Sequence, residues 1–252
     1  MSRCQEGLSL VELLIAMVLA LLSLGLVFSI FSALSASSTQ TRQLAFLQQN
    51  GQLVLGILNN ELQNAGFWGG QDQRSLVQAS STITPPSNDC FKPGLDSGSF
   101  PQVDQPFISI FAAQATNGRQ LNCLTDLALG SEYLQLKRAV GQATVSAQMR
   151  SNRFYFKPDW QQGQFVDAEH ITTDDSLFFP YQHLVFYIQH QAHAGISIPV
   201  LMRKRLIRTA AGSASISTDS VMDGVVRLHF EFLLDTNLDG IADTRLNTAQ
   251  MT

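Results

Sequence analysis

The sequence predicts an α+β protein in which a long N-terminal α-helix packs on an antiparallel β-sheet head. Three observations predict it. An uncharged apolar run fills residues 13–34, an apolar stripe at helical spacing continues to residue 65, and strand-like segments recur from residue 131 to residue 234. We therefore expect four parts in chain order, namely residues 1–7, 8–34, 35–66 and 67–252, the last being the head.

Composition limits the classes of function. The chain has 252 residues, a net charge of −4 and only 14% charged residues, which fits one ordinary domain with an apolar appendage. Its 16 Lys and Arg residues are outnumbered by 20 Asp and Glu residues, whereas a strongly basic balance is the electrostatic footprint of a nucleic-acid-binding protein. We therefore expect no nucleic-acid partner.

The apolar run is long enough for a membrane helix. No charged residue lies between Leu13 and Leu34, and a helix needs about 20 apolar residues to cross a bilayer. A transmembrane helix over residues 8–34 is predicted, with Arg3 favouring a cytoplasmic N-terminus. A cleaved secretory signal, with small residues at 33–36, and a plain single-span anchor are the alternatives. Neither explains Glu12, because a carboxylate at membrane depth is costly and is usually functional.

A short motif at the start of the run offers an explanation. Gly7-Leu8-Ser9-Leu10-Val11-Glu12-Leu13 places a Gly, a small polar residue and a Glu directly before the apolar segment. This stretch resembles the type III signal of type IV pilins and type II secretion pseudopilins. The resemblance implies that a prepilin peptidase cuts after Gly7 and methylates the new N-terminus at Leu8, so that residues 1–7 are a leader peptide. Leu8 stands where the family most often has Phe, and the leader MSRCQEG is less basic than is usual.

The resemblance also implies a partner for Glu12. When apolar helices pack in a filament, the freed amino group of Leu8 in one subunit would lie against the Glu12 carboxylate of the next. A buried ion pair costs far less than a lone buried charge. We therefore expect Glu12 to be needed for assembly and not for membrane insertion.

The second half of the predicted helix is amphipathic. Its apolar positions recur at alternating steps of three and four: Leu44, Leu47, Gly51, Val54, Leu58, Leu62 and Ala65. This stripe is interpreted as the face that docks on the head, and a groove for a partner helix is the alternative. The helix should end near Ala65, where Gly66 can supply a left-handed cap.

Residues 48–70, QQNGQLVLGILNNELQNAGFWGG, narrow the resemblance. An Asn50-Gly51 pair, an apolar stripe, an acidic residue at Glu61 and an Ala-Gly-aromatic-x-Gly exit at residues 65–69 resemble the PilW-type minor pilins. Gln63 replaces the Arg that is usual near the exit. With the signal, the resemblance covers about the first 70 residues well and the remainder loosely.

The resemblance implies a function and a location. The chain would be a minor pilin that primes type IV pilus assembly at the tip, with other minor and major pilins, and a tip adhesin, as partners. It would sit first in the bacterial inner membrane with its head in the periplasm, and later in the pilus. A type II secretion pseudopilin, or a membrane-tethered periplasmic binding or enzymatic domain, is the alternative.

The first part of the head is rich in Ser, Gln, Pro and Gly, so residues 71–130 are predicted to be mostly irregular. Cys90 and Cys123 lie in this region. In a periplasmic head they should form a disulfide, which closes a loop of about 34 residues and stabilises the fold by roughly 4 kcal/mol. Two free thiols are the alternative.

Strands should follow from residue 131. The predicted segments are residues 131–140, 153–158, 183–190, 198–208 and 225–234, of which the last alternates apolar and polar residues most regularly. Residues 183–190 and 199–208, separated by a polar loop at QAHAG, are predicted to form a hairpin.

A calcium loop is predicted near the C-terminus. Oxygen-bearing side chains alternate around Gly240, and short loops of this kind wrap a hard cation such as Ca²⁺. The predicted ligands are Asp235, Asn237, Asp239 and Asp243 through their side chains and Ile241 through its carbonyl, with a structural role for the ion. Leu246 stands where an EF-hand has its bidentate Glu. A tight β-turn at Asp239-Gly240 without an ion is the alternative.

Signs of catalysis are few. His190 and His193 have a spacing that could hold zinc, but the motif has no acidic residue. The sequence contains no nucleophile elbow, phosphate-binding loop or dinucleotide fingerprint. We therefore expect no enzymatic activity.

Overall fold

The computed structural model describes residues 9–71, 80–81, 83–102, 107–159, 163–171 and 175–250. The chain divides into two compact units, residues 1–53 and residues 54–252. They are called the helical unit and the sheet unit below. Gly7 and Leu8, the predicted cleavage and methylation site, lie outside the described residues, as does Cys4.

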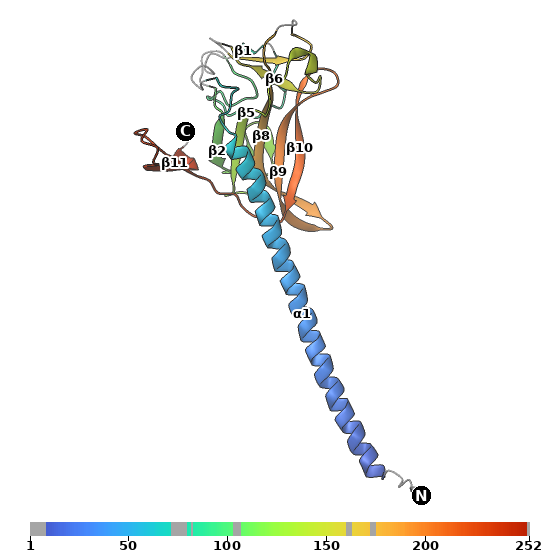
Figure 1. Ribbon diagram of the computed structural model, residues 1–252. Coiled ribbons are helices and arrows are strands. Elements are labelled where there is room, and N and C mark those ends of the chain that lie inside the picture. The colour runs from blue at the N-terminus through green and yellow to red at the C-terminus, as the bar shows by residue number, and fades with distance from the viewer. Residues whose placement is uncertain are drawn as a thin grey trace. The chain divides into compact units, whose positions relative to one another are not determined.

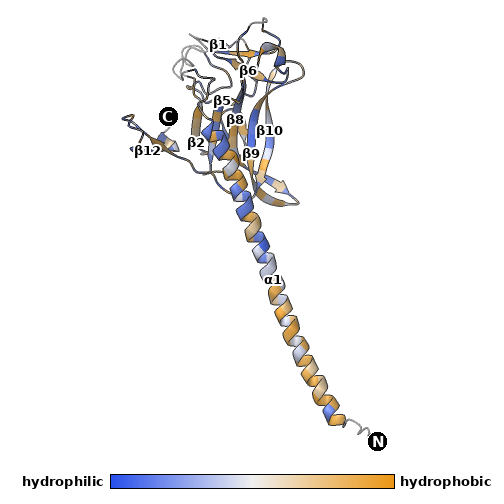
Figure 2. Cartoon of the chain, viewed as in Figure 1, coloured by the Kyte–Doolittle hydropathy of each residue, from blue (hydrophilic) through white to orange (hydrophobic). Residues whose placement is uncertain are grey.

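Helix α1 (Leu10–Gln63) includes the apolar run and most of the stripe, as the sequence predicted. Figure 2 shows apolar residues dominating its N-terminal half and polar residues becoming frequent further along. The helix ends in a turn over residues 64–66, where Gly66 has φ 79°. A positive φ is easy only for Gly, which explains why the helix stops at this residue.

The described part of the sheet unit is rich in β-structure. Its strands are β1 (Ser80–Ser81), β2 (Ile110–Gln114), β3 (Arg119–Gln120), β4 (Leu124–Thr125), β5 (Glu132–Ala139), β6 (Phe154–Lys157), β7 (Gln164–Asp167), β8 (Phe179–His193), β9 (Ile196–Arg208), β10 (Ala214–Asp223), β11 (Glu231–Leu234) and β12 (Thr244–Asn247). Two short 3-10 helices, η2 (Ser146–Gln148) and η3 (Thr248–Gln250), accompany them.

Eight of these strands form the main sheet (Figure 1). Its order is β1-β7-β6-β8-β5-β2, with β9 paired to β8 and β10 paired to β9. Every pairing is antiparallel except that of β1 with β7. The predicted antiparallel sheet is therefore confirmed, and the long strand β8 lies at its centre.

The sheet buries both of its faces near the middle. In β5, Leu134 and Leu136 join one apolar cluster, which also contains Val54 and Leu58 of α1. Tyr133 and Ala139 join a second cluster on the opposite face, which contains Trp68 and the two cysteines of the irregular region. Since side chains alternate between the faces of a strand, β5 is buried along its whole length.

Trp68 is the centre of the second cluster. Its ring lies 5.2 Å from that of Phe156 and 6.0 Å from those of Phe165 and Tyr181, measured between centroids. The pairs with Phe156 and Phe165 are edge-to-face and the pair with Tyr181 is stacked. Aromatic pairs in such arrangements stabilise by about 0.5–1.5 kcal/mol beyond the area they bury. The aromatic residue at the exit of α1 therefore anchors the end of the helix in the core.

Three strand predictions need correction. Residues 225–230 form no strand, although residues 231–234 do, as β11. The loop predicted at residues 191–195, QAHAG, is shorter than expected, because β8 continues to His193 and β9 begins at Ile196. The two strands are joined by a two-residue turn at Ala194-Gly195, where both φ values are positive. Strands β1, β2, β7 and β10 of the main sheet were not predicted. The Ser-rich sequence of β10 lacks clean alternation, and this strand depends on backbone pairing with β9.

Candidate functional site

The start of α1 holds Glu12 in a reciprocal pair of hydrogen bonds. The backbone N–H of Ser9 donates to Oε2 of Glu12 at 3.0 Å, and the backbone N–H of Glu12 donates to Oγ of Ser9 at 3.3 Å. This is a capping box, which satisfies two backbone donors that a helix start leaves without partners. The carboxylate thus has a local role in addition to the predicted contact with a neighbouring subunit.

The apolar run of α1 is exposed throughout. From Leu10 to Gln49 every side chain is exposed, including all the leucines between Leu13 and Leu34. The helix is long and apolar enough to cross a membrane by length and composition. Exposure of so much apolar surface is unfavourable in water, so this segment needs a lipid or protein environment.

Part of the predicted stripe docks on the sheet. Val54 and Leu58 are buried, and Ile57 and Ala65 are partly buried against the same cluster. Leu44, Leu47, Gly51 and Leu62 are exposed, so the docking face is confirmed only for Val54, Leu58 and Ala65. One polar contact supports the docked end, because Arg138 of β5 forms an ion pair with Glu61 at 2.6 Å.

Cys90 and Cys123 form a disulfide, as the sequence predicted. The bond ties the irregular segment before β2 to the residue that precedes β4, and both half-cystines are buried in the aromatic cluster. The short segment beside Cys123 is tightly turned, since Leu121 and Asn122 both have positive φ.

The predicted calcium loop is folded around its own backbone. The carboxylate of Asp235 accepts the N–H groups of Leu238, Asp239 and Gly240, at 2.6, 3.2 and 2.7 Å. Asp239 accepts the N–H of Ile241, and Asp243 accepts the hydroxyl of Thr236. In the described residues no group of three or more His, Cys, Asp or Glu side chains is placed to hold a metal ion. Asn237 donates to Asp239, so these side chains contact one another and the backbone.

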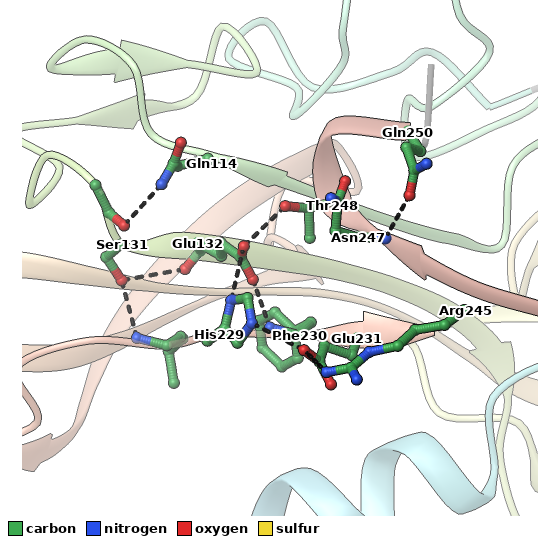
Figure 3. A network of polar contacts seen from close by, with 12 residues as sticks. Gln114, Ser131, Glu132, His229, Phe230, Glu231, Arg245, Asn247, Thr248 and Gln250 are labelled. Atoms are coloured by element: carbon green, nitrogen blue, oxygen red, sulfur yellow. Dashed lines mark hydrogen bonds and ion pairs between the residues drawn. The ribbon is translucent and has the colours of Figure 1, made fainter. Parts of the chain in front are cut away.

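Glu132, the first residue of β5, holds the C-terminal segment against the main sheet. Its buried carboxylate accepts hydrogen bonds from the backbone N–H of Phe230 and from Oγ1 of Thr248, and it pairs with Nδ1 of His229 at 3.1 Å (Figure 3). The backbone N–H of Leu228 donates to Oγ of Ser131. The backbone N–H of Glu132 also donates to the carbonyl of Leu228, at 3.1 Å. Residues 225–230 are thus held mainly by side chains of Ser131 and Glu132 and belong to no sheet.

A buried polar network crosses the second cluster. The hydroxyl of Ser99 contacts both the carboxylate of Asp89 and Nδ1 of His183, while Nε2 of Gln135 lies 2.7 Å from Nε2 of His183. The same Nε2 of Gln135 donates to the carbonyls of Cys90 and Ser97, at 2.7 Å each, so the amide ties the irregular segment to β5. Burial, together with the charge of Lys137, lowers the pKa of His183 well below its usual value, and the ring is neutral.

Lys137 is the charged neighbour of this network. Its Nζ donates to the carbonyl of Gly98 at 2.9 Å and lies 3.9 Å from the centroid of Phe107. Burial lowers the pKa of Lys137 to about 7, against the opposing effect of Asp96 and Asp89. Ser99, His183 and Asp89 resemble a hydrolytic triad in composition only. All three are buried, and Ser99 lies between the other two instead of beside a free imidazole nitrogen, so the network is structural.

His190 and His193 do not converge. Both lie in β8, where residues three positions apart point to opposite faces, and both are exposed. His190 contacts the hydroxyl of Ser197 on the neighbouring strand. The pair is therefore not arranged as a zinc site.

In comparisons with known proteins, no family model, curated protein or solved structure matches this chain. The resemblance to pilins therefore depends on the motifs of residues 7–13 and 48–70 alone.

Sequence reasoning did not identify several of these contacts. The capping box was readable from the Ser-x-x-Glu spacing of Ser9 and Glu12. By contrast, Glu132 and His183 carry no local signal, since their partners are far away in the chain. Arg138, the partner of Glu61, is likewise 77 residues distant from it.

Proposed function

We propose that this chain is a PilW-type minor pilin, which takes part in type IV pilus assembly and primes the filament tip through packing of its N-terminal helix. The observation that carries the proposal is a capped, exposed apolar helix that begins at the prepilin-like motif. Its later turns, from Val54, dock on an antiparallel sheet. Prepilin peptidase, other pilins and a tip adhesin are the proposed partners.

The proposed route begins in the inner membrane, with the sheet unit in the periplasm. Cleavage after Gly7 would free the amino group of Leu8, and methylation would follow. In the filament this amine would lie against Glu12 of an adjacent subunit. A carboxylate accepts more than two hydrogen bonds, so the capping role of Glu12 leaves room for this contact. A type II secretion pseudopilin is the second candidate, because the same signal serves both systems.

The first test is the mature N-terminus. Mass spectrometry of the chain from cells with an active prepilin peptidase should find a methylated Leu8 as the first residue. An intact Met1 in those cells would contradict the pilin proposal and favour a tethered periplasmic domain. Loss of surface pili from a deletion strain, restored by the intact gene, would favour a pilus over a secretion system.

The second test separates pairing from capping at Glu12. Glu12→Gln keeps the hydrogen-bond acceptor of the capping box but removes the charge. Ser9→Ala removes one capping bond but keeps the charge. We expect both variants to insert in the membrane, and only Glu12→Gln to fail to enter filaments. Normal filament entry of Glu12→Gln would eliminate the ion pair, and equal failure of both variants would point to capping.

A further inference from the structure

The C-terminal hairpin of β11 and β12 presents apolar side chains to solvent. Leu238 is 88% exposed, Ile241 70% and Leu233 68%. In the described residues the hairpin pairs with no other strand, and Figure 1 draws it apart from the main sheet. Leu238 also has φ 64°, a conformation that is uncommon for leucine. A leucine held in this way at a loop tip, beside a second exposed apolar residue, is typical of a contact surface.

The same hairpin is acidic. Between residues 231 and 247 it carries four carboxylates, of Glu231, Asp235, Asp239 and Asp243, against one arginine, Arg245. Arg245 is already paired with Glu231. The loop tip therefore combines two exposed apolar side chains with an excess of negative charge.

A complementary surface lies where β6 and β9 separate. Both strands pair with the same side of β8, but Pro180 is the last residue paired with β6 and Leu184 the first paired with β9. Residues 181–183 keep their partners in β5, but on this side they have no strand partner among the described residues. A cavity of about 370 Å³ opens at this position, which is called the β6–β9 fork.

The fork is lined by apolar and positively charged residues, of which Arg153 and Arg205 are exposed and form its rim, whereas Arg208 is buried. Phe154, Pro180, Leu206 and Ile207 contribute apolar surface, and the charged lining residues are Arg153, Arg205 and Arg208, with no carboxylate among them.

The arginines of the fork differ in how far they are already paired. Arg208 is bound to Asp167 and Glu169, and Arg205 lies 3.5 Å from Asp219. The guanidinium of Arg153 has no ion-pair or hydrogen-bond partner in the described part of the chain. Oε1 of Gln182, at the base of the fork, is buried without a hydrogen-bond partner there. The fork can therefore receive both a carboxylate and a hydrogen-bond donor.

We propose that the hairpin tip of one copy docks in the β6–β9 fork of a second copy. Leu238 and Ile241 cover the apolar lining residues, and the carboxylates of the loop face Arg153 and Arg205. Hairpin and fork are different surfaces of one chain, so the contact is head-to-tail and can repeat from copy to copy. Both surfaces belong to the sheet unit, so this contact does not depend on the pilin proposal.

Cross-linking of the full-length chain in membranes tests the docking. Two copies are co-expressed, one with Leu238→Cys and one with Arg153→Cys. Both copies also carry Cys4→Ser, so that the only other cysteines are Cys90 and Cys123, which are joined in the native disulfide. Chelator is present, so that no bound cation neutralises the loop. Mild oxidation should yield a covalent dimer at least about tenfold above that of a control pair in which Leu129→Cys replaces Leu238→Cys; Leu129 is also exposed, at 70% against 88% for Leu238. A yield no higher than that of the control would overturn the proposal.

A charge test checks the same contact independently. The cross-linking pair is now Ile241→Cys with Arg205→Cys. Leu238→Arg in the first chain should lower the yield at least about tenfold, because it faces the arginine rim. Adding Arg153→Glu to the second chain should restore it. A yield unaffected by Leu238→Arg, or one not restored by Arg153→Glu, counts against the docking. If the cells make pili that depend on this chain but no cross-link forms, the docking proposal is wrong and the pilin proposal stands. If the cross-link forms but pili do not depend on the chain, the pilin proposal is wrong and the docking proposal stands.

Discussion

Arg138 donates two hydrogen bonds to the same oxygen of Glu61, from Nε at 3.0 Å and from Nη2 at 2.6 Å. The pair joins the last turn of α1 to the central part of the sheet, and both side chains are largely buried. In such a position the attraction offsets the loss of hydration only while both partners are present. Glu61 is also the acidic residue that the PilW-type motif places near the helix end.

Removal of one partner should therefore be costly. Glu61→Leu leaves the Arg138 guanidinium buried without its carboxylate, and the free energy of unfolding should fall by about 3–5 kcal/mol. The double variant Glu61→Leu/Arg138→Met should recover most of this loss. Denaturant unfolding of the full-length chain in detergent measures both. Glu231→Leu, which breaks an exposed pair with Arg245, is the control and should change the free energy of unfolding much less.

Glu132 should determine how firmly the C-terminal segment is held. Glu132→Gln replaces a carboxylate that accepts from Phe230 and Thr248, and hydrogen bonds to a charged group contribute about 1.5–3 kcal/mol. Hydrogen exchange at the amides of residues 228–234 should accelerate by roughly 10- to 100-fold. Exchange in the docked turns of α1 should not change. Glu231→Gln is the exposed control, and equal exchange in the two variants would contradict the role of Glu132.

Local patterns in the sequence predicted most of the regular structure. The uncharged run and the three-four stripe predicted α1, and alternation with β-branched and aromatic residues predicted β5, β6, β8 and β9. The disulfide followed from two cysteines in a head expected to be periplasmic. These features depend on residues close together in the chain or on composition, and both can be read from a single sequence.

The features that were missed depend on distant partners. Residues 225–230 alternate like a strand in sequence, and Leu228 is buried, but Val226 on the same predicted face is 71% exposed. Their backbone is held mainly by side chains of Ser131 and Glu132. No local pattern distinguishes this arrangement from a sheet. The β6–β9 fork likewise arises because two strands, about 40 residues apart in the chain, share one side of β8.

Calcium binding by the C-terminal loop remains a prediction. An ion would have to recruit oxygens of Asp235 that now accept three backbone N–H groups, so binding should reorganise the loop. Isothermal titration of the full-length chain should show heat on adding Ca²⁺, and chelator should lower the melting temperature. Asp239→Ala/Asp243→Ala should abolish both effects. Absence of heat with the unaltered chain would leave a loop stabilised by its own hydrogen bonds.

Stability should also depend on pH through His183. The folded chain keeps this ring neutral, whereas the unfolded chain binds a proton below about pH 6.5. The unfolded state then binds more protons, so the free energy of unfolding falls as the pH drops below this value, by up to about 1.4 kcal/mol per pH unit. Lys137 acts in the same direction in a higher window, from its unfolded pKa of 10.5 down to its folded pKa of about 7.

His183→Gln isolates the lower of these windows. The variant should be less stable at pH 7.5, because Gln fills the site imperfectly, but its unfolding free energy should fall less steeply from pH 6.5 to pH 5 than that of the unaltered chain. His193→Gln is the matched control, since His193 is exposed at the end of β8, and it should keep the original slope. Denaturant unfolding at half-unit pH intervals gives these slopes. If His183→Gln and the unaltered chain lose stability in parallel below pH 6.5, the acid sensitivity originates elsewhere, and a neutral His183 in the Ser99–Gln135 network does not cause it.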